Sequence, residues 1–359
     1  MRSIRVLIVD DSLVFREMLA RELVKEPNID IVGMASDPFE ARDRIIQLNP
    51  DVMILDVEMP KMNGIEFLRR LLPQHPIPAI VSSSIAGTVF DALDAGAVDF
   101  VAKPSSVGIR EDYIKELIEK LIGASGAHVK IRNSLRKRTL NSQTVPGKEP
   151  GIQTGTNPLQ GFPLLNYKEK IIAIGASTGG TEAILSVLAK LPERIPGIVI
   201  VQHMPAVFTA FYAERLNKQC LFKVREAQDN DRVEPGLALV APGGDRQMRL
   251  VKDLRGFCVR LIDMEKVSGH RPSVDYLFDS VADAVGKNAI GVILTGMGAD
   301  GAKGLLKMRE KGASTIGQDS DSCVVYGMPM AAYNMGAVMR QLPLDKISGE
   351  IVEWLKRET

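Results

Sequence analysis

Three aspartates end two of the most apolar runs of this chain. Asp10 and Asp11 close the run IRVLIVDD, and Asp56 closes the run DVMILD. Continuous runs rich in β-branched residues indicate buried strands, and parallel strands present their carboxyl ends at one edge of a sheet. Carboxylates gathered there would repel one another unless a hard divalent cation joined them, and Mg²⁺ prefers oxygen ligands. The pattern predicts Mg²⁺-assisted phosphoryl transfer, with Asp56 as the acceptor because it ends a central strand.

Two more polar side chains follow predicted strands. Ser82 ends a later apolar run, and Lys103 follows DFVA. The hydroxyl could hydrogen-bond a new phosphoryl group, and the ammonium could reach the same edge as a cation. An aspartate or serine after a strand can also be an ordinary turn former or helix cap. Five residues of suitable type at the ends of four strands favour a phosphorylation site.

A serine in a glycine-rich turn indicates a second site. Ser177 lies in GASTGG, and it becomes a nucleophile only beside a base that a third group orients. His203 ends the next buried run and Asp300 follows another, so we expect the three side chains to meet at one sheet edge. The glycines around Ser177 and Met297 leave backbone N–H groups open for an oxyanion.

Alternatives for this second site stay open from the residues alone. His270, in GHRPSVD, is a rival base, and Asp275 is a rival orienting carboxylate. GASTGG could instead cradle the phosphates of a dinucleotide, but it lacks the GxGxxG spacing, and His203 rather than an acid ends the next strand. The turn is also similar to the nucleophile elbow of α/β-hydrolases, whose order is serine, acid, histidine, whereas the order here is serine, histidine, aspartate.

Length and composition indicate two packed domains. The chain has 359 residues, 45% of them hydrophobic, and a formal net charge of +1 that demands neither nucleic acid nor a membrane surface as partner. Cys220, Cys258 and Cys323 fit no metal or disulfide pattern. The N-terminus lacks a secretory apolar region, and no run is long enough to span a bilayer. We therefore expect a soluble, cytoplasmic protein.

Alternating strand and helix patterns predict a parallel sheet with helices on both faces over residues 1–122. The strand-like runs are Ile4–Val9, Ile29–Val32, Val52–Leu55, Ala79–Ser82 and Asp99–Ala102. Residues 123–167 carry Gly, Pro, Ser, Thr, Asn and the basic cluster RNSLRKR, which predicts a partly flexible linker. Residues 168–359 again predict α/β structure, with Val224–Arg260 as an antiparallel insertion.

IVDDS, ILDVEMPKMNG, VSS and DFVAKP together resemble the receiver domain of response regulators over the first third of the chain. The resemblance implies a flavodoxin-like (βα)5 fold in which Asp56 is phosphorylated. It implies Mg²⁺ bound by Asp11 and Asp56, with Asp10 helping to hold it, and by the backbone carbonyl of Glu58. It also implies a set of side chains that respond to the phosphoryl group, namely Ser82, Phe100 and Lys103.

GASTGGTEAI, QHMP, GHRPSVD and LTGMGADG resemble the catalytic domain of the chemotaxis protein-glutamate methylesterase family, CheB. The resemblance implies a doubly wound α/β esterase domain with a mainly parallel sheet, and Ser177 as nucleophile, His203 as general base and Asp300 as the orienting group. Thr178 and the backbone of Met297 would lie at the oxyanion site. No metal is expected at this second site.

The resemblance also implies substrates and control. The expected substrates are glutamate methyl esters and certain glutamines on chemoreceptors, and the expected phosphodonor is the chemotaxis histidine kinase. We hypothesise that the unphosphorylated receiver covers Ser177. We expect a monomer, with no nucleic acid bound and no membrane insertion. A ligand-binding module without turnover and a DNA-binding regulator are the alternatives, and the latter would need a helix-turn-helix in the second half.

Overall fold

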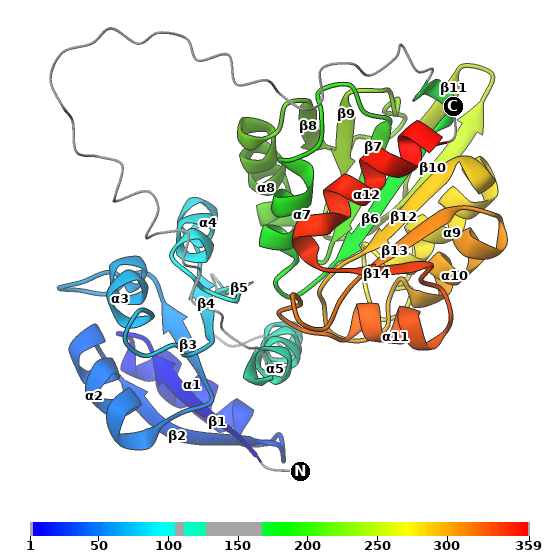
Figure 1. Cartoon of the computed structure of the whole chain (residues 1–359). Helices are drawn as coiled ribbons and strands as arrows, with labels where there is room; N and C mark the ends of the chain where they lie inside the picture. Colours follow the sequence, from blue (N-terminus) through cyan, green and yellow to red (C-terminus); the bar gives the residue numbers. More distant parts are fainter. Residues whose placement is uncertain (1–2, 105–110, 127–166, 358–359) are drawn as a thin grey trace, which may run out of the picture.

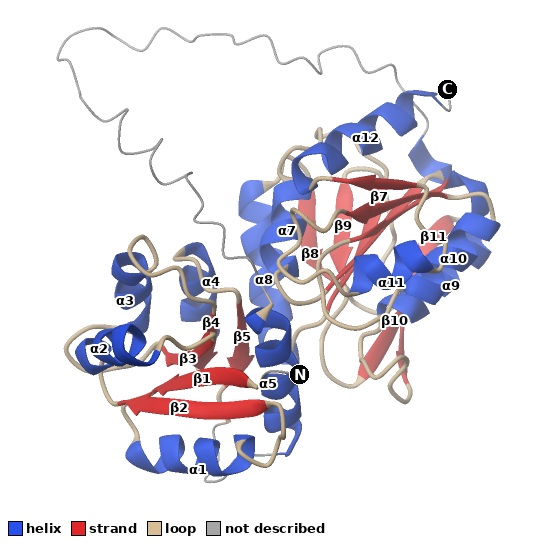
Figure 2. Cartoon of the chain, turned by 60° about the horizontal axis from the view of Figure 1, so that its bottom comes forward, coloured by secondary structure: helices blue, strands red, loops and turns tan. Residues whose placement is uncertain are grey.

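The computed structural model describes residues 3–104, 111–126 and 167–357, which form two α/β domains (Figures 1 and 2). Most of the predicted linker, including RNSLRKR, lies outside the described residues. Within these ranges, none of the helices combines the length and apolar character that crossing a membrane requires.

The first domain is a parallel sheet in the order β2-β1-β3-β4-β5. Its strands are β1 (Ile4–Val9), β2 (Ile29–Ala35), β3 (Val52–Asp56), β4 (Ala79–Ser83) and β5 (Asp99–Ala102). Its helices are α1 (Leu13–Leu23), α2 (Pro38–Leu48), α3 (Gly64–Leu71), α4 (Ala86–Asp94) and α5 (Glu111–Ser125). α1 and α5 cover one face, and the other helices cover the opposite face. This confirms the predicted (βα)5 fold, and α5 continues into the first residues assigned to the linker.

Side-chain caps explain why helices begin so soon after strands in this domain. Ser12 accepts the N–H of Phe15 at 3.3 Å at the start of α1. Asn63 accepts the N–H of Glu66 at 2.8 Å at the start of α3. Each cap satisfies a backbone donor that the first helical turn leaves unpaired. The short connection after β1 therefore holds Asp10 and Asp11 at the edge of the sheet.

The second domain is a parallel sheet in the order β14-β13-β12-β6-β7-β9-β8. Its strands are β6 (Ile171–Ala176), β7 (Gly197–Gln202), β8 (Lys223–Glu226), β9 (Leu237–Val240), β12 (Ala289–Ile293), β13 (Ser314–Gln318) and β14 (Arg340–Leu342). Its helical elements are η1 (Tyr167–Glu169), α7 (Gly180–Leu188), α8 (Ala206–Gln219), α9 (Val274–Val285), η2 (Gly286–Asn288), α10 (Ala302–Glu310), α11 (Met328–Asn334) and α12 (Leu344–Arg357).

Helices cover both faces of this sheet as well. α7, α8 and α12 pack on one face, and α9, α10 and α11 pack on the other (Figure 1). The chain order reverses at β6, which lies between β7 and β12. Ligands of such sheets bind at this reversal, outside the carboxyl ends of the strands. The domain is therefore doubly wound, as predicted.

The prediction of one antiparallel insertion over Val224–Arg260 was wrong for its first half. β8 pairs with β9 in parallel, and β9 pairs with β7 in parallel, so both belong to the main sheet. Only the hairpin of β10 (Arg246–Asp253) and β11 (Gly256–Asp263) is antiparallel. Runs of four residues carry too little periodicity to indicate their partner, and here long-range packing decided it.

The two domains contact each other through aromatic rings. Phe90 of α4 stacks on Tyr212 of α8 with ring centroids 6.0 Å apart. Phe100 of β5 lies against Phe208 of α8 with centroids 4.7 Å apart. All four rings belong to one buried apolar cluster that continues from one domain into the other. The burial of these rings favours the docked arrangement.

Candidate functional sites

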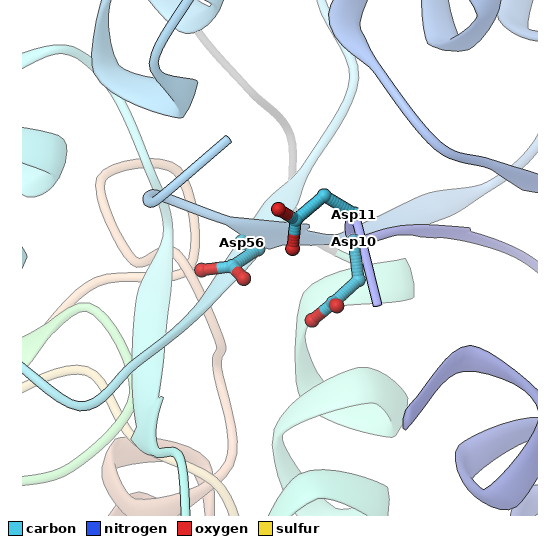
Figure 3. Close-up of side chains that lie close together, drawn as sticks. All are labelled: Asp10, Asp11 and Asp56. Carbon is cyan, nitrogen blue, oxygen red and sulfur yellow. The ribbon is translucent and has the colours of Figure 1, made fainter. Parts of the chain in front are cut away.

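Asp10, Asp11 and Asp56 form an acidic cluster at the carboxyl edge of the first sheet. β1 and β3 are neighbours, so the residues that follow or end them lie side by side. A carboxylate oxygen of each lies within 4.8 Å of the other two (Figure 3). Asp10 and Asp56 are buried, whereas Asp11 is exposed. The structure thus brings together the three predicted acids.

Lys103 is the counter-charge of this cluster. Its Nζ lies 2.7 Å from Asp10 Oδ2 and 2.6 Å from Asp56 Oδ2. Burial, together with the charge of Asp56, raises the pKa of Asp10 although Lys103 opposes the shift. Three carboxylates facing one ammonium leave an excess of negative charge on oxygen donors, and this donor set fits Mg²⁺. The backbone N–H of Glu58 donates to Asp56 at 3.0 Å, and the predicted role of the Glu58 carbonyl stays a prediction.

Two further predicted receiver residues lie on β4, which pairs with the strand of Asp56, and on β5, the next strand. Ser82 pairs with Asp56 in the register of β3 and β4, and its hydroxyl lies 2.8 Å from the hydroxyl of Tyr113. Phe100 is 1% exposed and points to the second domain through Phe208. A side chain two strands away from Asp56 therefore belongs to the contact between the domains.

Ser177 and His203 are neighbours at the carboxyl edge of the second sheet. Ala176 pairs with Gln202, so the residues that follow them leave β6 and β7 at the same level. The N–H of His203 donates to the carbonyl of Ala176 at 3.2 Å, and the N–H of Ser177 donates to the carbonyl of Thr295 at 3.0 Å. The serine is thus tied to the loop after β12.

Asp300 comes from that loop and bonds His203. Its Oδ2 lies 2.8 Å from His203 Nε2, and its side chain is fully buried. It also accepts the hydroxyl of Ser273 and the backbone N–H groups of Val274 and Asp275, at 2.7 to 2.9 Å. Burial by itself would raise the pKa of Asp300, but the hydrogen bonds from His203 and these amides hold it below its ordinary value.

The N-terminus of α9 thus stabilises a carboxylate that would otherwise be expensive to bury. Ser273 caps the same helix by accepting the N–H of Tyr276 at 3.3 Å. Ser273 was not predicted from the sequence to have a role. Its signal in the sequence is a serine directly before an amphipathic helix, in GHRPSVD.

The rival residues have other contacts. Asp275 accepts the N–H of Gly304 and the hydroxyl of Ser268, both at 2.8 Å. The ring of His270 stacks on that of His203, with centroids 3.8 Å apart and planes 13° apart. Burial, and then the neighbouring imidazole, lowers the pKa of His270 from 6.5 to about 4. His203 is therefore the histidine that bonds a buried carboxylate.

Thr178 and Met297 leave backbone donors beside Ser177. Neither N–H group donates to an acceptor within the described residues. The carbonyl of Thr178 accepts the hydroxyl of Thr295 at 3.0 Å, which fixes the turn. A Cβ atom on Gly296 would lie only 2.8 Å from Ser177 Cβ, so glycine allows the loop of Met297 to approach the serine.

A receiver-type acidic site joined to a serine, histidine and aspartate at one sheet edge defines a response regulator with an enzymatic output domain. The family model described as CheB methylesterase matches residues 172–351, and the one described as response regulator receiver domain matches residues 6–114. The chain therefore belongs to the CheB methylesterase family.

Individual relatives agree with this assignment. A protein-glutamate methylesterase/protein-glutamine glutaminase 2 of Syntrophomonas wolfei is 52% identical over 97% of this chain and 96% of its own length. A protein of the same kind from Caulobacter vibrioides is 46% identical over 98% of both chains. The crystal structure of the Thermotoga maritima CheB methylesterase catalytic domain is 38% identical, covers 52% of this chain and 98% of its own, and superposes with a TM-score of 0.50.

Proposed function

We propose that this chain hydrolyses glutamate γ-methyl esters, and deamidates particular glutamines, on chemoreceptors with Ser177 as the nucleophile. The observation that carries the proposal is the state of His203. Its Nε2 is bonded to buried Asp300, and its Nδ1 is buried without a hydrogen-bond partner among the described residues. With Nε2 donating to the carboxylate, Nδ1 is the acceptor available to a neighbouring hydroxyl.

The chemistry follows from this arrangement. Ser177 Oγ attacks the ester carbonyl carbon while its proton moves to His203 Nδ1, and Asp300 stabilises the imidazolium. The tetrahedral intermediate breaks its C–O bond, and methoxide leaves as methanol with that proton. Water then attacks the acyl-serine, gives a proton to Nδ1, and Nδ1 returns it to Ser177 Oγ. A glutamine side chain would react in the same way and release ammonia.

Thr178 and Met297 are the proposed oxyanion donors. Thr178 directly follows Ser177, Met297 follows Gly296, which approaches Ser177, and the turn after Ser177 leads into α7. Backbone donors held in place before the reaction stabilise the negative oxygen of the tetrahedral intermediate. The anchored Thr178 carbonyl would keep this turn from moving as charge develops.

In the receiver, Asp56 is the proposed phosphoryl acceptor, and a histidine kinase is the proposed donor. Asp10, Asp11, Asp56 and the carbonyl of Glu58 would hold Mg²⁺, which supplies charge neutralisation for phosphoryl transfer when bound. Lys103 would exchange its bond with Asp56 for one with the phosphoryl group, and Ser82 would leave Tyr113 to bond it.

Control would then act through access to Ser177. A Cβ atom placed on Gly123, near the end of α5, would lie 3.4 Å from Val325 Cγ2 and 3.7 Å from Met297 Sδ. The receiver thus lies against a proposed oxyanion residue, where it would obstruct a bulky helical substrate. Movement of Ser82 and Phe100 on phosphorylation would weaken the contact with Phe208 and open the site.

Ion pairs between α8, α4 and α7 support the same closed arrangement. Arg215 of α8 bonds Asp94 of α4 and Glu182 of α7, each at 2.6 Å. Its guanidinium also lies 5.7 Å from the ring of Phe90. Because Asp94 is half exposed, its ion pair with Arg215 would add little to stability and would mainly orient the two domains relative to each other.

The test is methanol release from methylated receptor membranes by the wild type and by Ser177→Ala, each with and without Mg²⁺ and a small-molecule phosphodonor. We expect release by the wild type, stimulation by the phosphodonor, and none by the variant. Release that is the same with and without the phosphodonor would support the esterase activity and contradict the proposed control. No release by the wild type would favour a binding module. We further propose that the protein acts in the cytoplasm, since its cysteines are unpaired. We also propose that it acts as a monomer.

A further inference from the structure

Gln202 is a buried amide that bridges the nucleophile and the base. It is the last residue of β7 and is 2% exposed. Its Nε2 donates to the carbonyl of Ser177 at 2.9 Å and to the carbonyl of His203 at 3.2 Å. One amide group therefore connects the backbones of two residues that leave different strands.

The position of this side chain follows from the strand. Ile198, Ile200 and Gln202 alternate along β7 and point to the face that α7 covers. A Cβ atom on Gly180, at the start of α7, would lie 2.2 Å from Gln202 Oε1 and 2.6 Å from Ala176 Cβ. The second of the paired glycines in GASTGG is thus needed because the amide packs directly against the turn.

The orientation of the amide, that is, which of its two ends carries the nitrogen, is also determined by its neighbours. Two carbonyl oxygens face the nitrogen, and an oxygen in that place would face two acceptors without a donor. The Oε1 atom is buried and has no hydrogen-bond partner within the described residues. A buried polar group left partly unpaired is unfavourable for stability, so its presence calls for another explanation.

That role is needed because the strand ladder ends here. Ala176 and Gln202 are the last paired residues of β6 and β7, and the last backbone bond between the strands runs from the N–H of His203 to the carbonyl of Ala176. Beyond them, the N–H of Ser177 bonds Thr295 on the other side, and its carbonyl accepts Gly180 N–H at 2.7 Å as well as the amide. Of these bonds to Ser177, only the amide joins its backbone to that of His203.

We propose that Gln202 is a positioning residue for the reaction, since its amide sets the separation of Ser177 Oγ and His203 Nδ1. This inference rests on the proposed function. Misplacement of reacting groups by about 1 Å costs up to about 100-fold in rate. Because Gln202 is buried and bonds the carbonyls of Ser177 and His203, it would contact neither the substrate nor the transferred proton. Its loss should therefore lower kcat and leave substrate binding unchanged.

The test compares full-length wild type with Gln202→Met, which keeps volume and removes both donors. The assay is methanol release with the phosphodonor, from which kcat, KM and the pH midpoint of kcat are obtained. We expect kcat to fall about 10- to 100-fold, with KM and the pH midpoint unchanged. A kcat within twofold of wild type, a change in KM alone, or a displaced pH midpoint would each overturn the proposal.

Ser348→Ala is the matched control. It removes another buried side-chain bond to a carbonyl, that of Val187 at 2.9 Å, on α12 and away from both strand ends. Its kcat should equal that of the wild type. Should Gln202→Met lack a cooperative melting transition, Gln202→Asn is measured instead, because its shorter amide cannot reach both carbonyls. A lower kcat then supports the proposal, and an unchanged kcat overturns it.

Ser177→Ala separates this inference from the proposed function. If the Ser177 variant keeps wild-type activity, the proposed nucleophile is wrong and the role of Gln202 falls with it. If Ser177→Ala is inactive while Gln202→Met is fully active, only the positioning role is overturned.

Discussion

Both sites lie at the carboxyl edge of a parallel sheet, the acidic cluster in the receiver and the serine site in the second domain. They differ in how far their negative charge is balanced. The receiver leaves three carboxylates facing one ammonium, with Asp11 open to solvent. The second site buries one carboxylate and surrounds it with four donors. The first site has excess negative charge, which a bound cation and a phosphoryl group would change. In the second site the carboxylate already has its hydrogen-bond donors.

This difference shows where control can act. Because the groups of the serine site are already in place, we expect control to act on the access of the substrate to Ser177 and not on the geometry of the site. The receiver has unbalanced charge at Asp10, Asp11 and Asp56, and Phe100, two strands from Asp56, lies against Phe208 of the other domain. A local change of charge in one domain can therefore alter a contact between domains.

The largest effect should follow from removing the charge of the preformed site. We expect Asp300→Asn to lower kcat about 10⁴-fold, because His203 would lose both its orientation and the stabilisation of its imidazolium. Methanol release gives the measurement. Asp279→Asn, on the exposed side of α9, is the control and should stay active. A loss of less than tenfold for Asp300→Asn would contradict a self-contained site.

The counterpart in the receiver is Asp56→Asn. Basal methanol release should remain, and stimulation by the phosphodonor should vanish. Couplings between sites are typically about 5- to 150-fold, and this is the factor expected to be lost. Residual stimulation in the variant would show that phosphorylation of Asp56 is not the signal that joins the two sites.

A substitution at the contact between α5 and the loop of Met297 should raise activity, whereas the two preceding substitutions lower it or abolish its stimulation. Gly123→Gln should raise basal activity about fivefold without phosphodonor, because the longer side chain would collide with Met297 and Val325. Gly123→Ala is the matched control, since its Cβ atom would make only ordinary contacts. Equal basal rates for the two variants would mean that the receiver does not cover the site.

The smallest effect concerns His270, which faces His203, Asp300 and Lys266. Its pKa is about 4 in the folded protein and 6.5 ordinarily, so the unfolded chain binds more protons between these values. Stability is therefore lost as the pH falls from about 6.5 to about 4. The melting temperature of the wild type should drop more steeply over this window than that of His270→Phe, which keeps the ring stack. Equal slopes would contradict a neutral, partly buried His270.

Much of both sites could be predicted from short motifs. Asp10, Asp11, Asp56 and Ser177 directly follow or end apolar runs, and local patterns are sufficient to place such residues at a sheet edge. The (βα)5 rhythm of the first domain is equally local. The partner strands of β8 and β9 were not predictable, because four-residue runs pair according to what the rest of the fold leaves available.

The sequence by itself determined which chemical groups are present and that strand ends would carry them. Only the tertiary structure decided which groups meet. Asp300 rather than Asp275 bonds His203, Ser273 bonds Asp300 from the start of α9, and Gln202 bonds the carbonyl of Ser177 from the end of β7. Local propensity acts over a few residues, whereas the hydrogen bond between His203 and Asp300 joins residues 97 positions apart and depends on how whole elements pack. No short pattern encodes that packing.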